Sequence, residues 1–187
     1  MTEIHFILKR TLHEFLISLY IFLDFIIPDF TILSSLRSKL LTIFTLSKIW
    51  KSTRIRKNQY LTNIKNLEIW KNCFVNRWNL FDNNWKISIW NDCWIWYDNK
   101  FLTTMHYEKQ NISKEKLKFS TYPQEIIIWN NVWITSNCTI LPWSKIWNNV
   151  IIASWSVVKW ELEDNFVYGW TPAKKIRPTE WFISKIN

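Results

Sequence analysis

The stretch that decides the fold runs from Ile128 to Val158 and reads IWNNVW-ITSNCT-ILPWSK-IWNNVI-IASWSV-V. An aliphatic residue recurs at every sixth position without a slip, at Ile128, Ile134, Ile140, Ile146, Ile152 and Val158. A period of six fits neither the 3.6-residue turn of an α-helix nor the simple alternation of a single strand. It is typical of a parallel β-helix, in which each hexad forms one short strand and one turn and three hexads close a triangular coil. The repeated aliphatic side chains point inward and stack from coil to coil.

Two further runs extend the same period toward the N-terminus, namely Ile69, Val75, Phe81 and Ile87, and then Ile89, Ile95 and Phe101. We therefore predict a mainly β chain, a parallel β-helix of hexapeptide repeats over residues 49–180 with a short N-terminal helical segment. The period stops at residues 103–124, which we expect to form a protruding loop, and residues 181–187 form a tail. The basic composition of that loop is also consistent with a plain solvated run of charges.

Residues 1–48 form an apolar lead whose run from Phe15 to Leu23 contains no charged residue. We expect one or two helices with a break near Pro28. Three roles stay open: a peripheral contact with the inner face of the cell membrane, packing on the rest of the protein or on a sister subunit, and a transmembrane span. Basic residues flank the lead, at Lys9, Arg10, Arg37, Lys39 and Lys48.

The net charge of +9, from 24 basic and 15 acidic residues, favours an anionic partner such as a phosphorylated cofactor, a membrane surface or nucleic acid. No nucleic-acid-binding motif appears, so we expect no nucleic-acid partner. Cys73, Cys93 and Cys138 are scattered and form no CxxC pair. We interpret them as buried reduced thiols of a cytoplasmic protein.

The chain contains 15 Trp and 1 Gly, whereas average usage predicts roughly 13 glycines in this length. Many of these tryptophans stand in turn contexts such as Asn84-Trp85 and Pro142-Trp143, where a bulky residue is unfavourable if φ is positive. We hypothesise that they stand for glycine, because a UGA codon that the host reads as glycine has been translated as tryptophan. A natural Trp-rich surface that binds carbohydrate is the alternative. The suspect positions are Trp50, Trp70, Trp78, Trp85, Trp90, Trp94, Trp96, Trp129, Trp143, Trp147, Trp155, Trp160 and Trp170, which leaves Trp133 and Trp181 as true tryptophans.

With glycine restored, the segment from Glu125 to Arg177 resembles the hexapeptide-repeat acyltransferases, above all the galactoside and maltose O-acetyltransferases and their surface-polysaccharide relatives. The likeness rests on residues 131–134, 139–143 and 154–158 and on the ending 169–177, which is similar to the family's terminal Gly-x-Pro-Ala-Lys element. It implies a left-handed parallel β-helix, an exception to the right-handed crossover rule. It also implies acetyl-CoA as co-substrate and a homotrimer with active sites between subunits.

The resemblance implies that His106 is the catalytic residue, since the family places its catalytic histidine at the root of the protruding loop. An imidazole can take the proton of an acceptor hydroxyl as that hydroxyl attacks the thioester. Asn76 matches an asparagine that lines the acceptor or thioester site, and Asp82 lies near the family's acceptor-binding carboxylate. Both residue types are also common in turns. Tyr107 stands where the family often has proline, which disfavours a simple maltose or galactoside acceptor.

The same resemblance implies a coenzyme site in the last coils. Trp133 would wall the pantetheine channel, Ser136 and Ser154 would contact the arm, and a main-chain N–H near Ser136 could stabilise an oxyanion. Lys159, Lys174 and Arg177 match or neighbour positions that meet the coenzyme's phosphates, although the match at Lys159 is to a polar residue rather than a lysine.

We therefore expect a cytoplasmic acetyl-CoA-dependent O-acetyltransferase, without a metal, that acts on a sugar hydroxyl in surface polysaccharide or glycan biosynthesis. The alternatives are a non-catalytic β-helical interaction module and an acyltransferase with a small non-sugar acceptor such as serine. Serine acetyltransferases carry a larger helical domain than 48 residues allow. A zinc enzyme of the γ carbonic anhydrase type needs three histidines, and two of the three here, His5 and His13, lie in the lead.

Overall fold

The computed structural model describes residues 31–45, 47–107 and 120–180, together with seven single residues of the lead: Thr11, Phe15, Ser18, Leu19, Phe22, Phe25 and Ile26. For Thr31, Ile32, Phe44, Thr45, Ile64, 105–107 and 120–123 it describes the backbone alone. The tail at 181–187, the middle of the expected loop and most of residues 1–30, including Pro28, lie outside the described residues.

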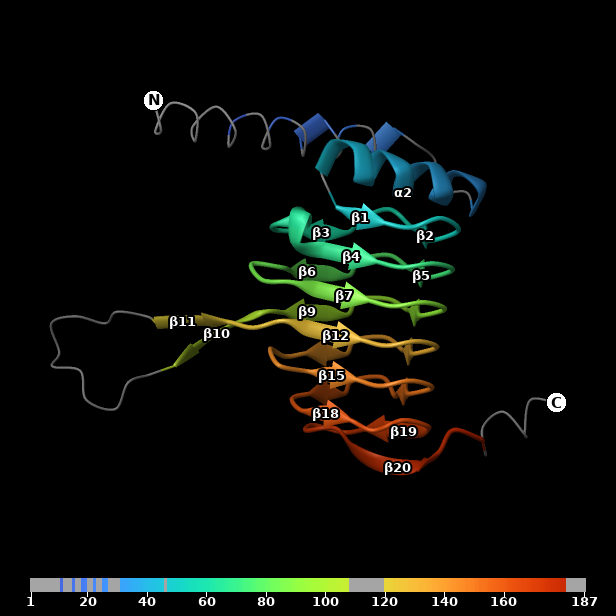
Figure 1. Ribbon diagram of the computed structural model, residues 1–187, viewed down its shortest axis with the longest axis vertical. Coiled ribbons are helices and arrows are strands. Elements are labelled where there is room, and N and C mark those ends of the chain that lie inside the picture. The colour runs from blue at the N-terminus through green and yellow to red at the C-terminus, as the bar shows by residue number, and fades with distance from the viewer. Residues whose placement is uncertain are drawn as a thin grey trace, which may run out of the picture.

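The described chain winds into a stack of triangular coils whose strands form three parallel sheets, with a helix at one end (Figure 1). Sheet A contains β1 (Lys48–Ile49), β4 (Leu67–Ile69), β7 (Ile87–Ile89), β12 (Ile126–Ile128), β15 (Lys145–Ile146) and β18 (Glu161–Leu162). Sheet B contains β2 (Arg54–Ile55), β5 (Phe74–Val75), β8 (Trp94–Ile95), β13 (Trp133–Ile134), β16 (Ile151–Ile152), β19 (Phe166–Gly169) and β20 (Lys174–Pro178), the last of which is antiparallel to β19. Sheet C contains β3 (Tyr60–Leu61), β6 (Leu80–Asp82), β9 (Lys100–Leu102), β14 (Thr139–Ile140) and β17 (Val157–Val158).

The register confirms the hexad prediction. Ile128 pairs with Ile146 in sheet A, Ile134 with Ile152 in sheet B, and Ile140 with Val158 in sheet C. All six side chains are completely buried. Each sixth residue therefore begins a new face of the triangle, and its aliphatic group joins one continuous core that runs along the solenoid axis.

The first coils are two residues longer than the hexad rule requires. Ile69 pairs with Ile89, twenty residues further on, and Leu67 pairs with Ile87. Ile87 and Ile89 are both buried because alternate residues of a strand point to the same side. This explains why one sequence run ends at Ile87 and the next begins at Ile89. The extra residues lie between sheets C and A, where the 3₁₀ helix η1 (Ile64–Asn66) belongs to the first coil.

Helix α2 (Thr31–Thr45) lies across the N-terminal end of the solenoid (Figure 1). It packs against β1 and β2, buries Leu41 in the core, and the Ser38 hydroxyl donates a hydrogen bond of 2.9 Å to the carbonyl of Thr53. Residues 31–45 thus cover the open end of the first coil, which would otherwise expose its core to water. Within the described part of the chain, no helix is long and apolar enough to cross a bilayer.

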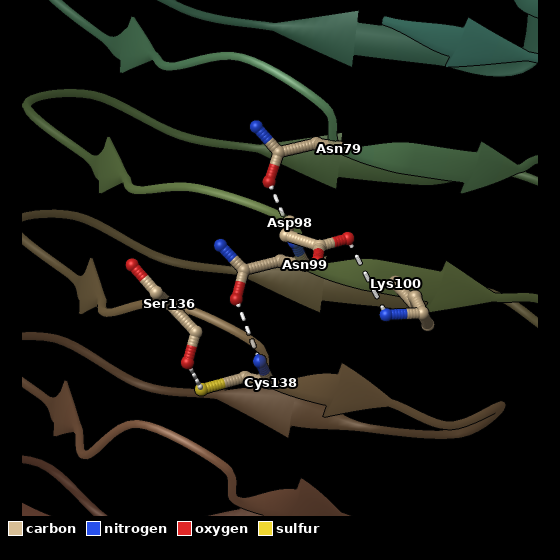
Figure 2. Close-up of polar contacts among 6 residues, drawn as sticks. All are labelled: Asn79, Asp98, Asn99, Lys100, Ser136 and Cys138. Atoms are coloured by element: carbon tan, nitrogen blue, oxygen red, sulfur yellow. Dashed lines mark hydrogen bonds and ion pairs between the residues drawn. The ribbon is translucent and has the colours of Figure 1, made fainter.

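Buried amide side chains tie successive coils together at the edge between sheets B and C, here called the B–C edge (Figure 2). The backbone N–H of Asn99 donates to Asn79 Oδ1 at 2.9 Å, and the backbone N–H of Cys138 donates to Asn99 Oδ1 at 2.8 Å. Backbone groups that face inward at a corner cannot reach water, so a buried amide satisfies them instead. These ladders hold the coils in register where the chain turns.

Ile152→Ala should destabilise the protein by about 2–5 kcal/mol, because it opens a cavity in a column that the neighbouring coils cannot collapse to fill. The free energy of unfolding from a urea titration is the measurement. Ile151→Ala, one residue away on the opposite face of β16, is the matched control and should cost clearly less, since Ile151 is only partly buried. Equal losses for the two variants would contradict the inward stacking.

Candidate functional site

An antiparallel hairpin interrupts the solenoid directly after β9. It is formed by β10 (Thr104–Tyr107) and β11 (Ser120–Pro123), with His106 opposite Thr121. The hairpin projects from the side of the stack between the coils of β9 and β12 (Figure 1). Its two strands lie within residues 103–124, the segment in which the hexad period is absent. The imidazole of His106 lies outside the described part of the structure, which gives only the backbone of this residue.

Thr103 anchors the hairpin at its root. This residue is completely buried, and its hydroxyl donates to the carbonyl of Asp82 at 2.6 Å while it accepts the N–H of Trp85 at 3.0 Å. Its carbonyl accepts the N–H of Gln124 at 2.8 Å, where the chain returns to the solenoid. The sequence analysis did not single out Thr103, because a buried threonine has no sequence signal apart from its place at the end of the period.

A polar cluster lies beside this root, at the edge between sheets C and A (the C–A edge). Asp82 Oδ1 accepts hydrogen bonds from Asn84 Nδ2 at 2.8 Å and from the Thr62 hydroxyl at 3.3 Å. Asn84 Nδ2 also lies 3.3 Å from the hydroxyl of Thr104, two residues before His106. The structure therefore brings Asp82 to the base of the strand that carries His106. Asn84, Thr62 and Thr104 are additional polar groups that the sequence analysis missed.

Asn76 lies elsewhere, at the B–C edge directly after β5. It is buried, and its side-chain oxygen accepts the backbone N–H of Arg77 at 3.0 Å. Its backbone carbonyl accepts from Asn79 at 2.7 Å and from Gln59 at 2.6 Å. These contacts are those of a turn residue within one chain. Asn76 and Asp82 sit at two different corners of the same coil, so a single chain does not bring them together.

Ser136 and Ser154 occupy the same B–C edge in later coils. The Ser154 hydroxyl donates to Thr135 Oγ1 at 3.1 Å. The Ser136 carbonyl accepts the N–H of Trp155 at 3.1 Å and the thiol of Cys138 at 3.7 Å, the second of which Figure 2 shows. Ser136 and Ser154 therefore lie at equivalent positions of adjacent coils, whereas Asn76 lies at the same edge two coils before Ser136.

Trp133 lines an open cavity of about 520 Å³ on the face of sheet B. The cavity is largely apolar because most of its wall is indole, and its lining residues are Asp92, Trp94, Trp96, Asn131, Val132 and Trp133. Trp94 lies opposite Trp133 in adjacent strands. The other indoles of this cavity, those of Trp94 and Trp96, belong to the positions suspected of standing for glycine.

The three cations expected near coenzyme phosphates do not gather in one place. Lys174 and Arg177 lie on β20, opposite Gly169 and Val167, at the last level of sheet B. Lys159 lies after β17 at the C–A edge, with its ammonium 4.8 Å from the ring centre of Trp160. Lys174 and Arg177 therefore share sheet B with Trp133, whereas Lys159 lies at a separate corner.

The described residues offer no group of three or more His, Cys, Asp or Glu side chains that could hold a metal ion. The three cysteines are free and buried. Burial raises the pKa of the Cys93 thiol well above its usual value, and the adjacent Cys73 raises it further. Burial also raises the pKa of Cys138. Cys93 and Cys138 are therefore poor nucleophiles, because the thiolate is the reactive form.

The sequence matches no protein-family model and no curated protein. Solved structures do match. A hexapeptide-repeat acetyltransferase from Vibrio cholerae superposes with a TM-score of 0.73 at 22% identity, over 89% of this chain and 92% of that one. A maltose O-acetyltransferase from Clostridium difficile 630 matches with a TM-score of 0.68 at 23% identity, over 76% of this chain and 74% of that one. A galactoside acetyltransferase in complex with coenzyme A also has a TM-score of 0.68, at 24% identity, over 76% of this chain and 70% of that one.

At these identities the likeness concerns the course of the backbone. It confirms the predicted fold, including its handedness and the short helical segment before the repeats. The chain therefore has the left-handed parallel β-helix fold of the hexapeptide-repeat acetyltransferases.

Proposed function

We propose that this protein is an acetyl-CoA-dependent O-acetyltransferase that acts on a sugar hydroxyl, in the biosynthesis of a surface polysaccharide or another glycan. The observation that carries the proposal is the hairpin β10–β11, which bears His106 and leaves the solenoid beside Asp82 and Asn84. Solved structures of the same fold, among them the Vibrio cholerae enzyme, contain acetyl-CoA or coenzyme A, which supports acetyl-CoA as the donor.

The proposed reaction is direct acetyl transfer. The imidazole of His106 takes the proton of the acceptor hydroxyl, and the hydroxyl oxygen attacks the thioester carbonyl carbon. The tetrahedral intermediate carries its charge on the former carbonyl oxygen, where a backbone N–H near Ser136 would stabilise it. Collapse breaks the carbon–sulfur bond, and the imidazolium returns its proton to the departing thiolate, so that the products are the acetyl ester and coenzyme A.

The polar cluster at the C–A edge suits the acceptor. Sugar hydroxyls both donate and accept hydrogen bonds, so a carboxylate, a carboxamide and two hydroxyls can bind them from several directions. These groups come from a chain of hydrogen bonds that joins Thr62 to Asp82 at 3.3 Å, Asp82 to Asn84 at 2.8 Å and Asn84 to Thr104 at 3.3 Å. Trp133, Ser136 and Ser154 would line the pantetheine arm, with Lys174 and Arg177 toward the phosphates. Lys159, at the other edge, is the least suited of the proposed phosphate contacts.

His106→Ala should lower the rate of acetyl transfer by about 10²–10⁴-fold, the usual contribution of a positioned general base. The assay follows coenzyme A release with a thiol reagent against oligosaccharides, monosaccharides and serine. His13→Ala, which changes a histidine of the N-terminal lead, is the control and should keep full activity. A His106→Ala protein as active as the parent would favour the non-catalytic reading of the fold, as would a parent chain that releases no coenzyme A with any acceptor.

We further propose a homotrimer whose active sites lie between copies. Within one chain Asn76, Ser136 and Ser154 lie at the B–C edge, whereas Asp82 and the His106 hairpin lie at the C–A edge. A site that needs both groups is complete only if the C–A edge of one copy faces the B–C edge of the next, as a head-to-tail ring allows.

Mixed assemblies test this arrangement. Equal amounts of the inactive His106→Ala and Asn76→Ala chains, unfolded together and refolded as a mixture, should regain about one quarter of the parent activity, because random assembly pairs an intact His106 with an intact Asn76 at that fraction of interfaces. Each variant refolded alone is the control and should stay inactive. A mixture that contains mixed trimers by native mass spectrometry and yet stays inactive would show that the site lies within one chain.

We also propose that the protein works in the cytoplasm with its lead on the inner face of the membrane. Phe15, Phe22 and Phe25 expose 61%, 60% and 83% of their side chains, and the net charge of +9 favours anionic lipid.

Replacing all three phenylalanines with serine should reduce co-sedimentation of the protein with phosphatidylglycerol vesicles at least several-fold. Neutral phosphatidylcholine vesicles are the control. Unchanged binding to the anionic vesicles would contradict a membrane role of this face.

A further inference from the structure

The corners of the solenoid force many residues into the left-handed region of φ. In the described chain thirteen non-glycine residues have positive φ: Ser52, Asn58, Asn72, Trp78, Asp92, Asp98, Asn131, Asn137, Trp143, Asn149, Trp155, Asn165 and Trp170. Nine are Asn, Asp or Ser, whose short polar side chains can hydrogen-bond to the nearby backbone. The other four are tryptophan, a bulky residue for which this region is a genuine outlier.

The positive φ at these positions results from the geometry of the solenoid corner and not from the indole side chains. At the B–C edge, Asn137 directs its N–H to the carbonyl of Tyr97 at 3.0 Å, and Trp155 one coil later directs its N–H to the carbonyl of Ser136 at 3.1 Å. The two residues therefore have the same backbone role. Their side chains differ, since the Trp155 ring is 72% exposed and gains little from packing. Trp78, Trp143 and Trp170 are likewise exposed, by 45%, 45% and 71%.

The one glycine of the chain does not fill such a position. Gly169 is needed for space, because a Cβ there would lie 2.7 Å from Cδ1 of Ile176. Glycine is the residue that adopts a positive φ most easily, yet none of the thirteen positions with positive φ in the described chain is glycine.

We propose that residues 78, 143, 155 and 170 are glycine in the polypeptide that the natural host makes, and that the host reads the UGA codon as glycine. One codon has one meaning throughout a gene, so the reassignment extends to the other suspect tryptophans that UGA encodes. The backbone does not require glycine at the nine other suspect positions, because their φ is not positive. These positions are Trp50, Trp70, Trp85, Trp90, Trp94, Trp96, Trp129, Trp147 and Trp160. Five of them, Trp50, Trp70, Trp90, Trp129 and Trp147, stack in a column with ring centres 4.2–6.4 Å apart.

Peptide mapping of the protein purified from its natural host tests the identity of these residues directly. The tryptic peptides 78–86, 119–145, 146–159 and 160–174 together contain all four positions. Each should have the mass and fragment ions of glycine at residue 78, 143, 155 or 170. Trp133, in peptide 119–145, is the internal control and should remain tryptophan. Fragment ions for tryptophan at the four positions would overturn the proposal.

Stability measurements on the chain expressed with the sequence as written test the backbone argument separately. Trp78→Gly and Trp155→Gly should each raise the thermal midpoint by about 2–4 °C, since glycine tolerates positive φ. Trp94→Gly is the matched control: its ring is 49% exposed, close to the 45% of Trp78, but it lies in strand β8 and its φ is not positive. The thermal midpoint of Trp94→Gly should not rise. Equal shifts at Trp78 and Trp94 would contradict the role of φ.

A consequence for the site rests on the proposed function. Trp78, Trp155 and Trp170 follow the B–C edge beside Arg77 and Ser154, so glycine at these positions would leave bare backbone where a pantetheine arm could lie. Coenzyme A should then bind the chain with all three changed to glycine at least tenfold more tightly than the chain as written, by isothermal titration. Equal affinity would contradict the placement of the coenzyme groove at this edge and leave the peptide masses unaffected.

Discussion

The whole structure depends on one column of aliphatic side chains that stack along the solenoid axis. No single coil can bury its own inward residues, so each coil is stable only between neighbours. This requirement fixes the register at the three faces, because a shift of one residue would turn every inward side chain toward solvent. It also explains the structure at the two ends of the solenoid. Helix α2 covers the first coil, and β20 folds back along β19.

In a solenoid with such a core, the functional residues lie at the edges between the sheets. The faces are occupied by short strands in regular register, so irregular segments are tolerated only at the corners, where the chain leaves one sheet and enters the next. The hairpin that bears His106 is inserted at such a corner, and Thr103 fixes its two ends by three hydrogen bonds. Ser136 and Ser154 lie on one straight line along the stack, because equivalent corner residues of successive coils lie above one another.

The sequence predicted those features that the core dictates. Ile128 to Val158 fixed the period, and the loss of that period after Phe101 located the hairpin. It did not predict the length of the first coils, because Ile87 and Ile89 both suit the inward face and a hexad count cannot choose between them. The hexad run does place Asn76, after Val75, and Asp82, after Phe81, at successive corners. It could not predict that Asp82 contacts Thr62 and Asn84, because the period carries no information on contacts between polar side chains. The docking of α2 was left open because its apolar residues suit a membrane, a partner or the open end of a coil equally well.

We propose that this solenoid binds an acyl-coenzyme A at an edge and presents its thioester to His106. A crystal structure of the protein grown with coenzyme A is the decisive experiment. We expect a trimer with coenzyme A between two copies, its thiol close to the imidazole of one copy and its pantetheine arm along Ser136 and Ser154 of the other. Coenzyme A bound far from His106, or a monomer that binds none at saturating concentration, would contradict this placement of the active site.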